Sequence, residues 1–311
     1  MSELRKALNE YLAIRRALGF KLDVQGGLLH RFIDFAEGAQ ASFVTRDLAL
    51  AWATSPKECQ PAQWAIRLAV LRRFAEYRSA ADPRTEILPM GLLPHRFCRK
   101  APYIYSDDEI VRLIEAAKKL SSPKGLRAAT YSTLFGLLAV TGMRRGEPIA
   151  LNHEDVDTTE GILIVRQAKF GKSRLVPLHP STRNVLRRYA RFRDQIFPVP
   201  KSKSFFVSER GTRLTRANVN WTFIKISRWI GIRSQISRGG PRIHDLRHGF
   251  AIRTLLRLYR KTEDVEPRLP ALATYLGHSN VLNTYRYLSA TPELMRLASM
   301  RLDGKRRGVT V

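Results

Sequence analysis

The chain has 311 residues, more than the ~250–300 at which a single hydrophobic core usually stops growing, so we expect two domains. Its hydrophobic fraction of 44% is typical of packed domains rather than of disordered chains. The 54 Lys and Arg residues outnumber the 27 Asp and Glu residues, and the resulting net charge of +27 implies a polyanionic partner such as nucleic acid. An anionic membrane is the rival partner, but the basic residues are spread along the chain and its longest apolar stretch falls short of the ~20 residues that span a bilayer.

Residues 1–82 predict a helical domain. Apolar residues recur at helical spacing in successive stretches without any alternating strand pattern, and Trp52 and Trp64 fall within them as expected core residues. Four prolines then occur between residues 83 and 102, which discourages a continuous helix. We therefore place an extended linker over residues 83–104.

The remaining residues, 105–311, predict a second domain that is mainly helical. Ser106 and Glu109 stand at the spacing of a capping box and mark its first helix. The runs GILIVRQ and SRLVPL, separated by AKFGK, predict a β-hairpin, and SFFVS at 204–208 predicts a third short strand. Helical patterns follow, and Trp221 and Trp229 within one of them are expected in the core. This part of the chain carries most of the positive charge, because residues 1–100 have a net charge of only +6.

Four separated segments of the second domain combine residue types that can act on a phosphodiester. They are TGMRRGE (141–147), AKFGKSRLVPL (168–178), HDLRH (244–248) and LGHSNVLNTYRY (276–287). Guanidinium groups and imidazole N–H groups can hold the negative charge that develops on phosphoryl oxygens, a tyrosine can serve as the nucleophile, and a lysine can protonate the leaving oxygen. Such a set needs no metal and no cofactor, and we expect neither.

The same segments resemble the tyrosine recombinases, also called phage-type integrases. TGMRRGE matches the family's arginine and the glutamate three residues later, KFGKSRLVPL its β-hairpin lysine, HDLRH its His-x-x-Arg box, and LGH its second histidine. The resemblance implies a catalytic set with Glu147 in a supporting role, the set being Arg144, Lys169, His244, Arg247, His278 and Tyr287. Lys172 remains an alternative to Lys169 as the general acid, because Phe170 replaces a glycine that is common in the hairpin.

Two tyrosines compete for the role of nucleophile. In the family the nucleophile lies nine residues after the second histidine, which selects Tyr287 over Tyr285. Residues two apart on a helix point about 200° from each other, so the two phenols cannot share one target. Tyr285 is therefore expected to face away from the site.

The histidines of HDLRH allow a second interpretation. His244 and His248 have the i, i+4 spacing of some zinc ligands, but no third ligand is apparent, and we interpret His248 as a residue that packs beside the site. Cys59 and Cys98 lack the spacing of a zinc module, and we expect both to be packing residues.

The resemblance implies a fold and an activity. The fold is a SAM-like, helical core-binding domain joined to an α+β catalytic domain with a small antiparallel sheet, which together form a C-shaped clamp on DNA. The implied activity is site-specific recombination of double-stranded DNA through a 3′-phosphotyrosyl intermediate, by a homotetramer that needs neither metal nor ATP. We expect it in the bacterial cytoplasm, associated with the nucleoid and not with membranes. A type IB topoisomerase-like enzyme and a non-catalytic DNA-binding protein are the alternatives.

Overall fold

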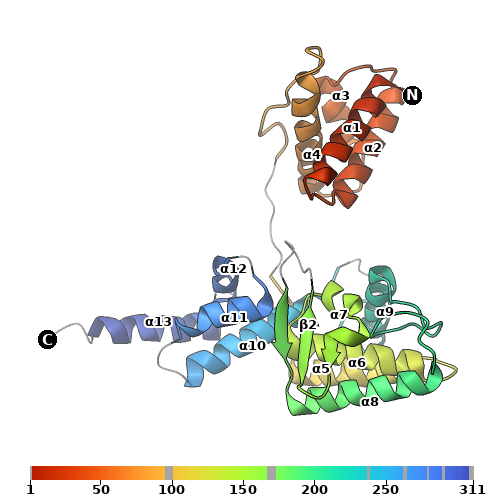
Figure 1. Ribbon diagram of the computed structural model, residues 1–311. Helices are drawn as coiled ribbons and strands as arrows, with labels where there is room; N and C mark the ends of the chain where they lie inside the picture. The colour runs from red at the N-terminus through yellow and green to blue at the C-terminus, as the bar shows by residue number, and fades with distance from the viewer. Residues whose placement is uncertain are drawn as a thin grey trace. The chain divides into compact units, whose positions relative to one another are not determined.

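The computed structural model describes residues 2–94, 101–166, 173–236, 239–261, 265–278, 280–288 and 291–307, the last seven of these without their side chains. The chain divides into two compact units, Met1–Lys100 and Ala101–Val311 (Figure 1). Among the described residues, no helix combines the length and the apolarity needed to cross a bilayer.

The first unit is a bundle of helices, as the sequence predicts. The helices are α1 (Glu3–Ala17), α2 (Asp23–Gly38), α3 (Arg46–Thr54) and α4 (Pro61–Ser79). Ser2 and Thr45 cap α1 and α3 by accepting hydrogen bonds from backbone N–H groups in the first turn, and Pro61 opens α4 at a position where its missing N–H costs nothing. Trp52 is fully buried in this core, where its ring meets Phe32 edge to face, so its predicted core position is confirmed.

The segment after α4 packs on the first unit for part of its length. Leu88 is buried in that unit's core, and Leu92 and Leu93 lie against it. The Arg72 guanidinium donates to the carbonyl of Leu88 at 2.7 Å. The first part of the stretch that the prolines mark as a linker is therefore folded against α4, since its leucines have apolar surface to cover.

The second unit is built around one buried helix. Its helices are α5 (Asp107–Lys118), α6 (Leu126–Thr141), α7 (Gly146–Ala150), the 3₁₀ helix η1 (His153–Asp155), α8 (Pro180–Ile196), α9 (Arg216–Trp229), α10 (Asp245–Lys261), α11 (Arg268–Leu276), α12 (Leu282–Tyr285) and α13 (Pro292–Arg307). Helix α6 is apolar around most of its circumference, and α5, α8 and α10 pack against it. The predicted capping box of Ser106 and Glu109 is present at the start of α5.

A small antiparallel sheet covers part of this core. Its strands are β1 (Val156–Asp157), β2 (Ile162–Val165) and β3 (Arg174–Pro177), in that order. The predicted hairpin is confirmed by the β2–β3 pairing, although its turn lies outside the described residues. The predicted third strand at 204–208 is wrong: Ser204 and Val207 form only isolated bridges, and β1 takes that place in the sheet. Phe205 and Phe206 are buried there, so the run is apolar because it fills the core.

Two tryptophans contradict the sequence prediction. Trp221 and Trp229, expected in the core, are 59% and 56% exposed. They lie at i and i+8 on α9, one face of which carries the buried Val219, Phe223 and Ile226. The helical pattern identified α9 correctly but assigned its tryptophans to the wrong face.

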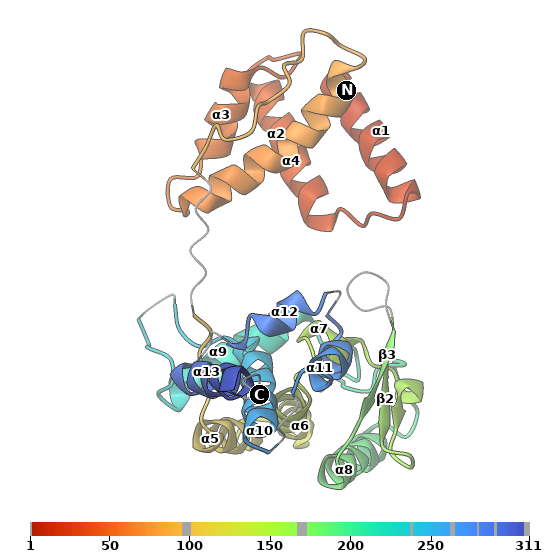
Figure 2. The same ribbon diagram turned by 90° about the vertical axis from the view of Figure 1, so that its left-hand side faces the viewer.

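The C-terminal helices form a further apolar cluster with Tyr287. Helices α10, α11 and α13 contribute residues such as Leu255, Leu269 and the fully buried Leu294. Helix α13 packs along α10 (Figure 1), and Arg260 and Glu293 form an ion pair between them. Helix α11 lies beside β3 and is therefore next to the sheet (Figure 2).

Candidate active site

Two helix ends meet at the centre of the site. Gly142 caps the C-terminus of α6 and Gly277 that of α11, and both glycines adopt left-handed backbone conformations, with φ of 61° and 68°. The last carbonyls of a helix lack partners within it, so each end presents oxygen acceptors and the negative end of a helix dipole. Cationic side chains are the natural partners of such ends.

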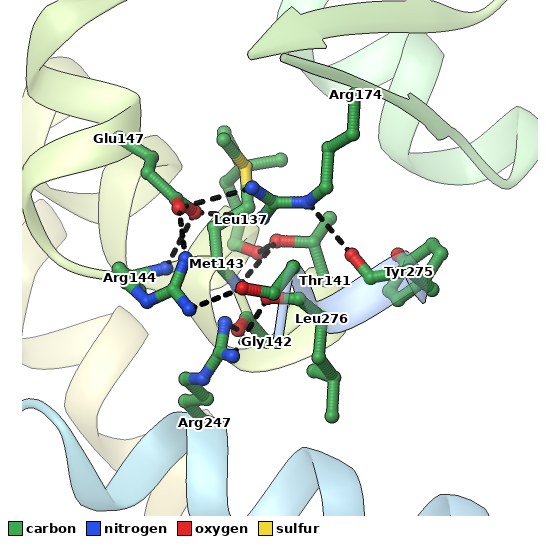
Figure 3. Close-up of polar contacts among 11 residues, drawn as sticks. Leu137, Thr141, Gly142, Met143, Arg144, Glu147, Arg174, Arg247, Tyr275 and Leu276 are labelled. Atoms are coloured by element: carbon green, nitrogen blue, oxygen red, sulfur yellow. Dashed lines mark hydrogen bonds and ion pairs between the residues drawn. The ribbon is translucent and has the colours of Figure 1, made fainter. Parts of the chain in front are cut away.

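Three arginines from different parts of the chain bind consecutive carbonyls at the end of α11. Arg174 Nε donates to the carbonyl of Tyr275 at 2.8 Å, Arg247 Nη2 to that of Leu276 at 2.7 Å, and Arg144 Nη2 to that of Gly277. Arg247 Nη1 also donates to the carbonyl of Gly142 at 2.8 Å, which ties the end of α6 to the end of α11 (Figure 3). One turn of backbone therefore orients all three guanidinium groups.

Glu147 lies between two of these arginines (Figure 3). Its carboxylate accepts hydrogen bonds from both Nη groups of Arg174, at 3.0 and 2.8 Å, and from Arg144 Nη1 at 3.0 Å. Burial alone would raise the pKa of Glu147, but the hydrogen bonds and charge of Arg174, followed by those of Arg144, hold this pKa below its usual value. The carboxylate is therefore ionised at neutral pH and orients the two arginines, which fits the supporting role that we expected.

Arg174 is the residue of this network that our sequence reasoning missed. It opens β3 and lies in the quoted hairpin motif SRLVPL, so a basic residue beside the expected lysine was the available signal. Its bonds to Glu147 and to the carbonyl of Tyr275 connect β3, α7 and α11. Arg174 thus anchors the hairpin to the site.

Arg247 is a buried cation that has no carboxylate partner among the described residues. Its exposed fraction is only 2%, and in the described part of the chain no acidic group forms an ion pair with it. Burial, followed by the positive charge of Arg144, lowers the pKa of Arg247 to about 10. Since a buried charge is costly unless paired, the arrangement favours the binding of an anion next to Arg247 and Arg144.

Tyr287 is buried beside Arg247, whereas Tyr285 is not buried. Tyr287 is 7% exposed and its hydroxyl lies 3.2 Å from His248 Nδ1, while Tyr285 is 42% exposed. Burial raises the pKa of Tyr287, and the charge of Arg247 and a hydrogen bond from it act in the opposite direction. The two phenols face different surroundings, as we expected, although α12 ends at Tyr285 and Tyr287 lies beyond it.

The two histidines of the expected set occupy different places. His278 follows Gly277, its Nδ1 lies 2.8 Å from Thr284 Oγ1, and its ring stacks on that of Tyr287 with centroids 6.1 Å apart. Burial, followed by the charges of Arg247 and Arg144, lowers the pKa of His278 to about 4, so it is neutral at pH 7. His244 is more exposed and contacts His248, with ring centroids 4.7 Å apart.

The structure thus gathers Arg144, Glu147, Arg247, His278 and Tyr287 around one point, with His244 at the edge. Lys169 and its alternative Lys172 lie outside the described residues. Across the residues that are described, no three His, Cys, Asp or Glu side chains come together as a metal site. Cys59 is a half-buried thiol that donates to the carbonyl of Pro56, and Cys98 lies outside the described residues.

Comparison with known proteins agrees with this geometry. The model of the phage integrase family matches residues 104–293. A Sinorhizobium fredii protein described as integrase/recombinase y4rB is 47% identical over 308 residues, covering 97% of this chain and 98% of the relative. Tyrosine recombinase XerD of Ralstonia nicotianae is 29% identical over 235 residues, covering 75% of this chain and 67% of the relative.

Solved structures share the fold. The Tn1549 transposon integrase in complex with transposon right end DNA has a TM-score of 0.63 and 16% identity, covering 96% of this chain and 99% of that one. A lambda integrase tetramer bound to a Holliday junction has a TM-score of 0.60 and 20% identity, covering 91% and 76%. Taken with the family match and the 47% identical relative, these findings place the chain in the phage integrase family, that of the tyrosine recombinases.

Proposed function

We propose that this tyrosine recombinase cleaves and rejoins DNA at specific sites, with Tyr287 as its nucleophile. The observation that supports this most directly is the buried Arg247, a cation without an ion-paired carboxylate in the described structure, beside a buried tyrosine hydroxyl. A backbone phosphate would supply the missing negative charge and bring phosphorus next to the phenol oxygen.

In the proposed reaction Tyr287 attacks the scissile phosphate, forming a 3′-phosphotyrosyl bond and releasing a 5′-hydroxyl. Arg144 and Arg247 hold the non-bridging oxygens, whose negative charge increases in the transition state. His278, neutral at pH 7, donates a hydrogen bond to the phosphate rather than a full charge. Because the phosphotyrosyl bond conserves the energy of the broken ester, the 5′-hydroxyl of another strand can rejoin it without ATP.

Lys169 is the proposed general acid that protonates the leaving 5′-oxygen, and His244 is proposed to assist proton transfer. Lys172 is the alternative acid. A 5′-bridging phosphorothioate distinguishes the two lysines, since its sulfur leaves without protonation. Rescue of cleavage in Lys169→Ala, and none in Lys172→Ala, supports Lys169, and the reverse pattern assigns the acid to Lys172.

The partner that we propose is double-stranded DNA, bound by both units. The net charge of +27 supports it, as do the DNA complexes of proteins that share the fold. We further propose that residues 1–82 form the core-binding domain, that residues 105–311 form the catalytic domain, and that four copies act together on two DNA sites in the bacterial cytoplasm at the nucleoid.

The test is covalent trapping on a nicked suicide duplex. The recombination site is first identified by sequencing the genomic fragments that become covalently attached to the wild-type protein. Denaturing gels then compare wild type, Tyr287→Phe and the matched control Tyr285→Phe. Trapping by wild type and Tyr285→Phe only is expected, and trapping by Tyr287→Phe would refute the assignment. Joined sites among the products would identify strand exchange, whereas relaxed circles alone would indicate a topoisomerase.

A further inference from the structure

We propose that His248 is a catalytic residue, which accepts the hydroxyl proton of Tyr287 as the phenol attacks phosphorus. The proposal rests on the nucleophilic role of Tyr287 proposed above. His248 lies one turn into α10, and its Nδ1 is 3.2 Å from the Tyr287 hydroxyl, within the reach of a general base. The ring centroids of the two residues are 5.5 Å apart.

The neighbours of the phenol determine the direction of this hydrogen bond. Arg247 and Arg144, the charged groups that act on Tyr287, carry only N–H donors and offer its hydroxyl no acceptor. The phenol's own proton then points toward an acceptor, and His248 Nδ1 is in place. This requires the tautomer of His248 that carries its proton on Nε2.

Neither of the other two histidines contacts the hydroxyl in the same way. His278 stacks face to face on the Tyr287 ring, at an interplanar angle of 23°, and its Nδ1 is engaged with Thr284. His244 contacts the ring of His248 instead. Within the described structure, His248 is therefore the histidine placed to take the proton, although we had interpreted it from the sequence as a packing residue.

The environment keeps His248 able to accept. Burial lowers its pKa below the usual value, with Asp245 acting in the opposite direction and the charges of Arg242 and Arg247 adding to the decrease. The titratable and charged groups that face it are His244, Asp245, Arg242, Arg247, His278 and Tyr287. His248 is accordingly neutral at pH 7 and gains a proton only under more acidic conditions.

The proton balance of the step is complete. As the bond between Tyr287 Oη and phosphorus forms, the phenol proton passes to His248 Nδ1, and the bond from phosphorus to the 5′-oxygen breaks while that oxygen takes a proton from the general acid. In rejoining, the 5′-hydroxyl attacks and gives its proton to the deprotonated general acid, the bond to Tyr287 breaks, and the His248 imidazolium returns its proton to the phenolate. The same residue thus acts as base in cleavage and as acid in ligation.

The kinetic test uses His248→Asn in the full chain on the suicide duplex. Asparagine places an acceptor oxygen near the position of Nδ1, so it can hold the tyrosine but cannot take its proton. Single-turnover cleavage should slow by roughly 10²-fold or more. The decrease in rate that we expect of wild type as His248 becomes protonated should be absent in the variant. His179→Asn, which replaces an exposed histidine at the N-cap of α8 by another good capping residue, is the matched control and should cleave as wild type does.

The outcomes are distinguishable. A His248→Asn protein that cleaves at the wild-type rate with an unchanged pH profile would overturn the role of His248 alone, whereas absence of any covalent complex with wild type would overturn Tyr287 as well. Nitrogen-15 spectra of histidine-labelled wild-type protein test the tautomer without any variant, and spectra of Tyr287→Phe provide a second check. We expect the proton of His248 on Nε2 and a shift of its Nδ1 signal in Tyr287→Phe; a proton on Nδ1 would contradict the assignment.

Discussion

Glu147 should be a main source of stability in the second unit, and Glu147→Gln tests this. The substitution keeps the shape of the side chain but removes the charge that pairs with Arg144 and Arg174. The carboxylate is 7% exposed at its side chain and Arg174 only 9%, so water cannot replace the lost partner. Removing one member of a buried ion pair costs about 3–5 kcal/mol, and we expect a loss of free energy of unfolding in this range.

Hydrogen exchange of the α6 and α10 amides, monitored by mass spectrometry, measures the stability of the second unit separately from that of the first. A loss of 3–5 kcal/mol should accelerate exchange of the most protected amides by roughly 10²- to 10⁴-fold. Glu293→Gln is the matched control, because its ion pair with Arg260 is exposed and should contribute only about 0–1 kcal/mol. Equal and small effects of the two substitutions would show that the arginines do not depend on Glu147.

Three further predictions concern single positions. Gly142→Ala should lower the thermal stability of the protein more than Gly161→Ala does. Both glycines have positive φ, but the new β-carbon at Gly142 would lie 2.5 Å from an aromatic ring carbon, whereas the nearest atom at Gly161 is 3.4 Å away. Equal losses would argue against the close contact at Gly142. Leu294→Ala should cost about 2–5 kcal/mol in urea unfolding and the exposed Met295→Ala almost nothing, and a small effect of the former would mean that α13 is not docked. The pKa of His278 is about 4 in the folded state, and an unfolded histidine titrates near 6.5, so the folded state binds fewer protons between these pH values and its stability falls with acidification. His278→Asn should therefore lose less stability than wild type between about pH 7 and pH 5. An equal loss would contradict the depressed pKa.

The sequence was sufficient for the parts of the molecule that depend on local patterns. Apolar periodicity located the helices of the first unit, and the spacing of Ser106 and Glu109 marked the start of α5. The motif segments identified Arg144 and Arg247 as residues that would meet, and the spacing from His278 favoured Tyr287, which the structure buries beside Arg247. Side-chain type and spacing carry this information because each helix or motif restricts its own residues.

What the sequence could not show depends on the tertiary arrangement. Backbone carbonyls have no residue-specific signal, so the binding of Arg247 to Gly142 and Leu276 was not predictable. The contact of His248 with the tyrosine hydroxyl depends on how α10 faces the segment after α11. The exposure of Trp221 was missed for the same reason, since an aromatic residue in a helix is compatible with either face until its neighbours are placed.

The run of carbonyls at Tyr275, Leu276 and Gly277 has a mechanical consequence. Three guanidinium groups donate hydrogen bonds to the carbonyls of a single turn, and Tyr287 follows ten residues after that turn. A displacement of the turn would therefore disturb one hydrogen bond of each guanidinium group at once, although the bonds to Gly142 and to Glu147 do not involve it. Because one short stretch of backbone holds all three side chains, their positions are coupled, and a change in that stretch reaches each of them together.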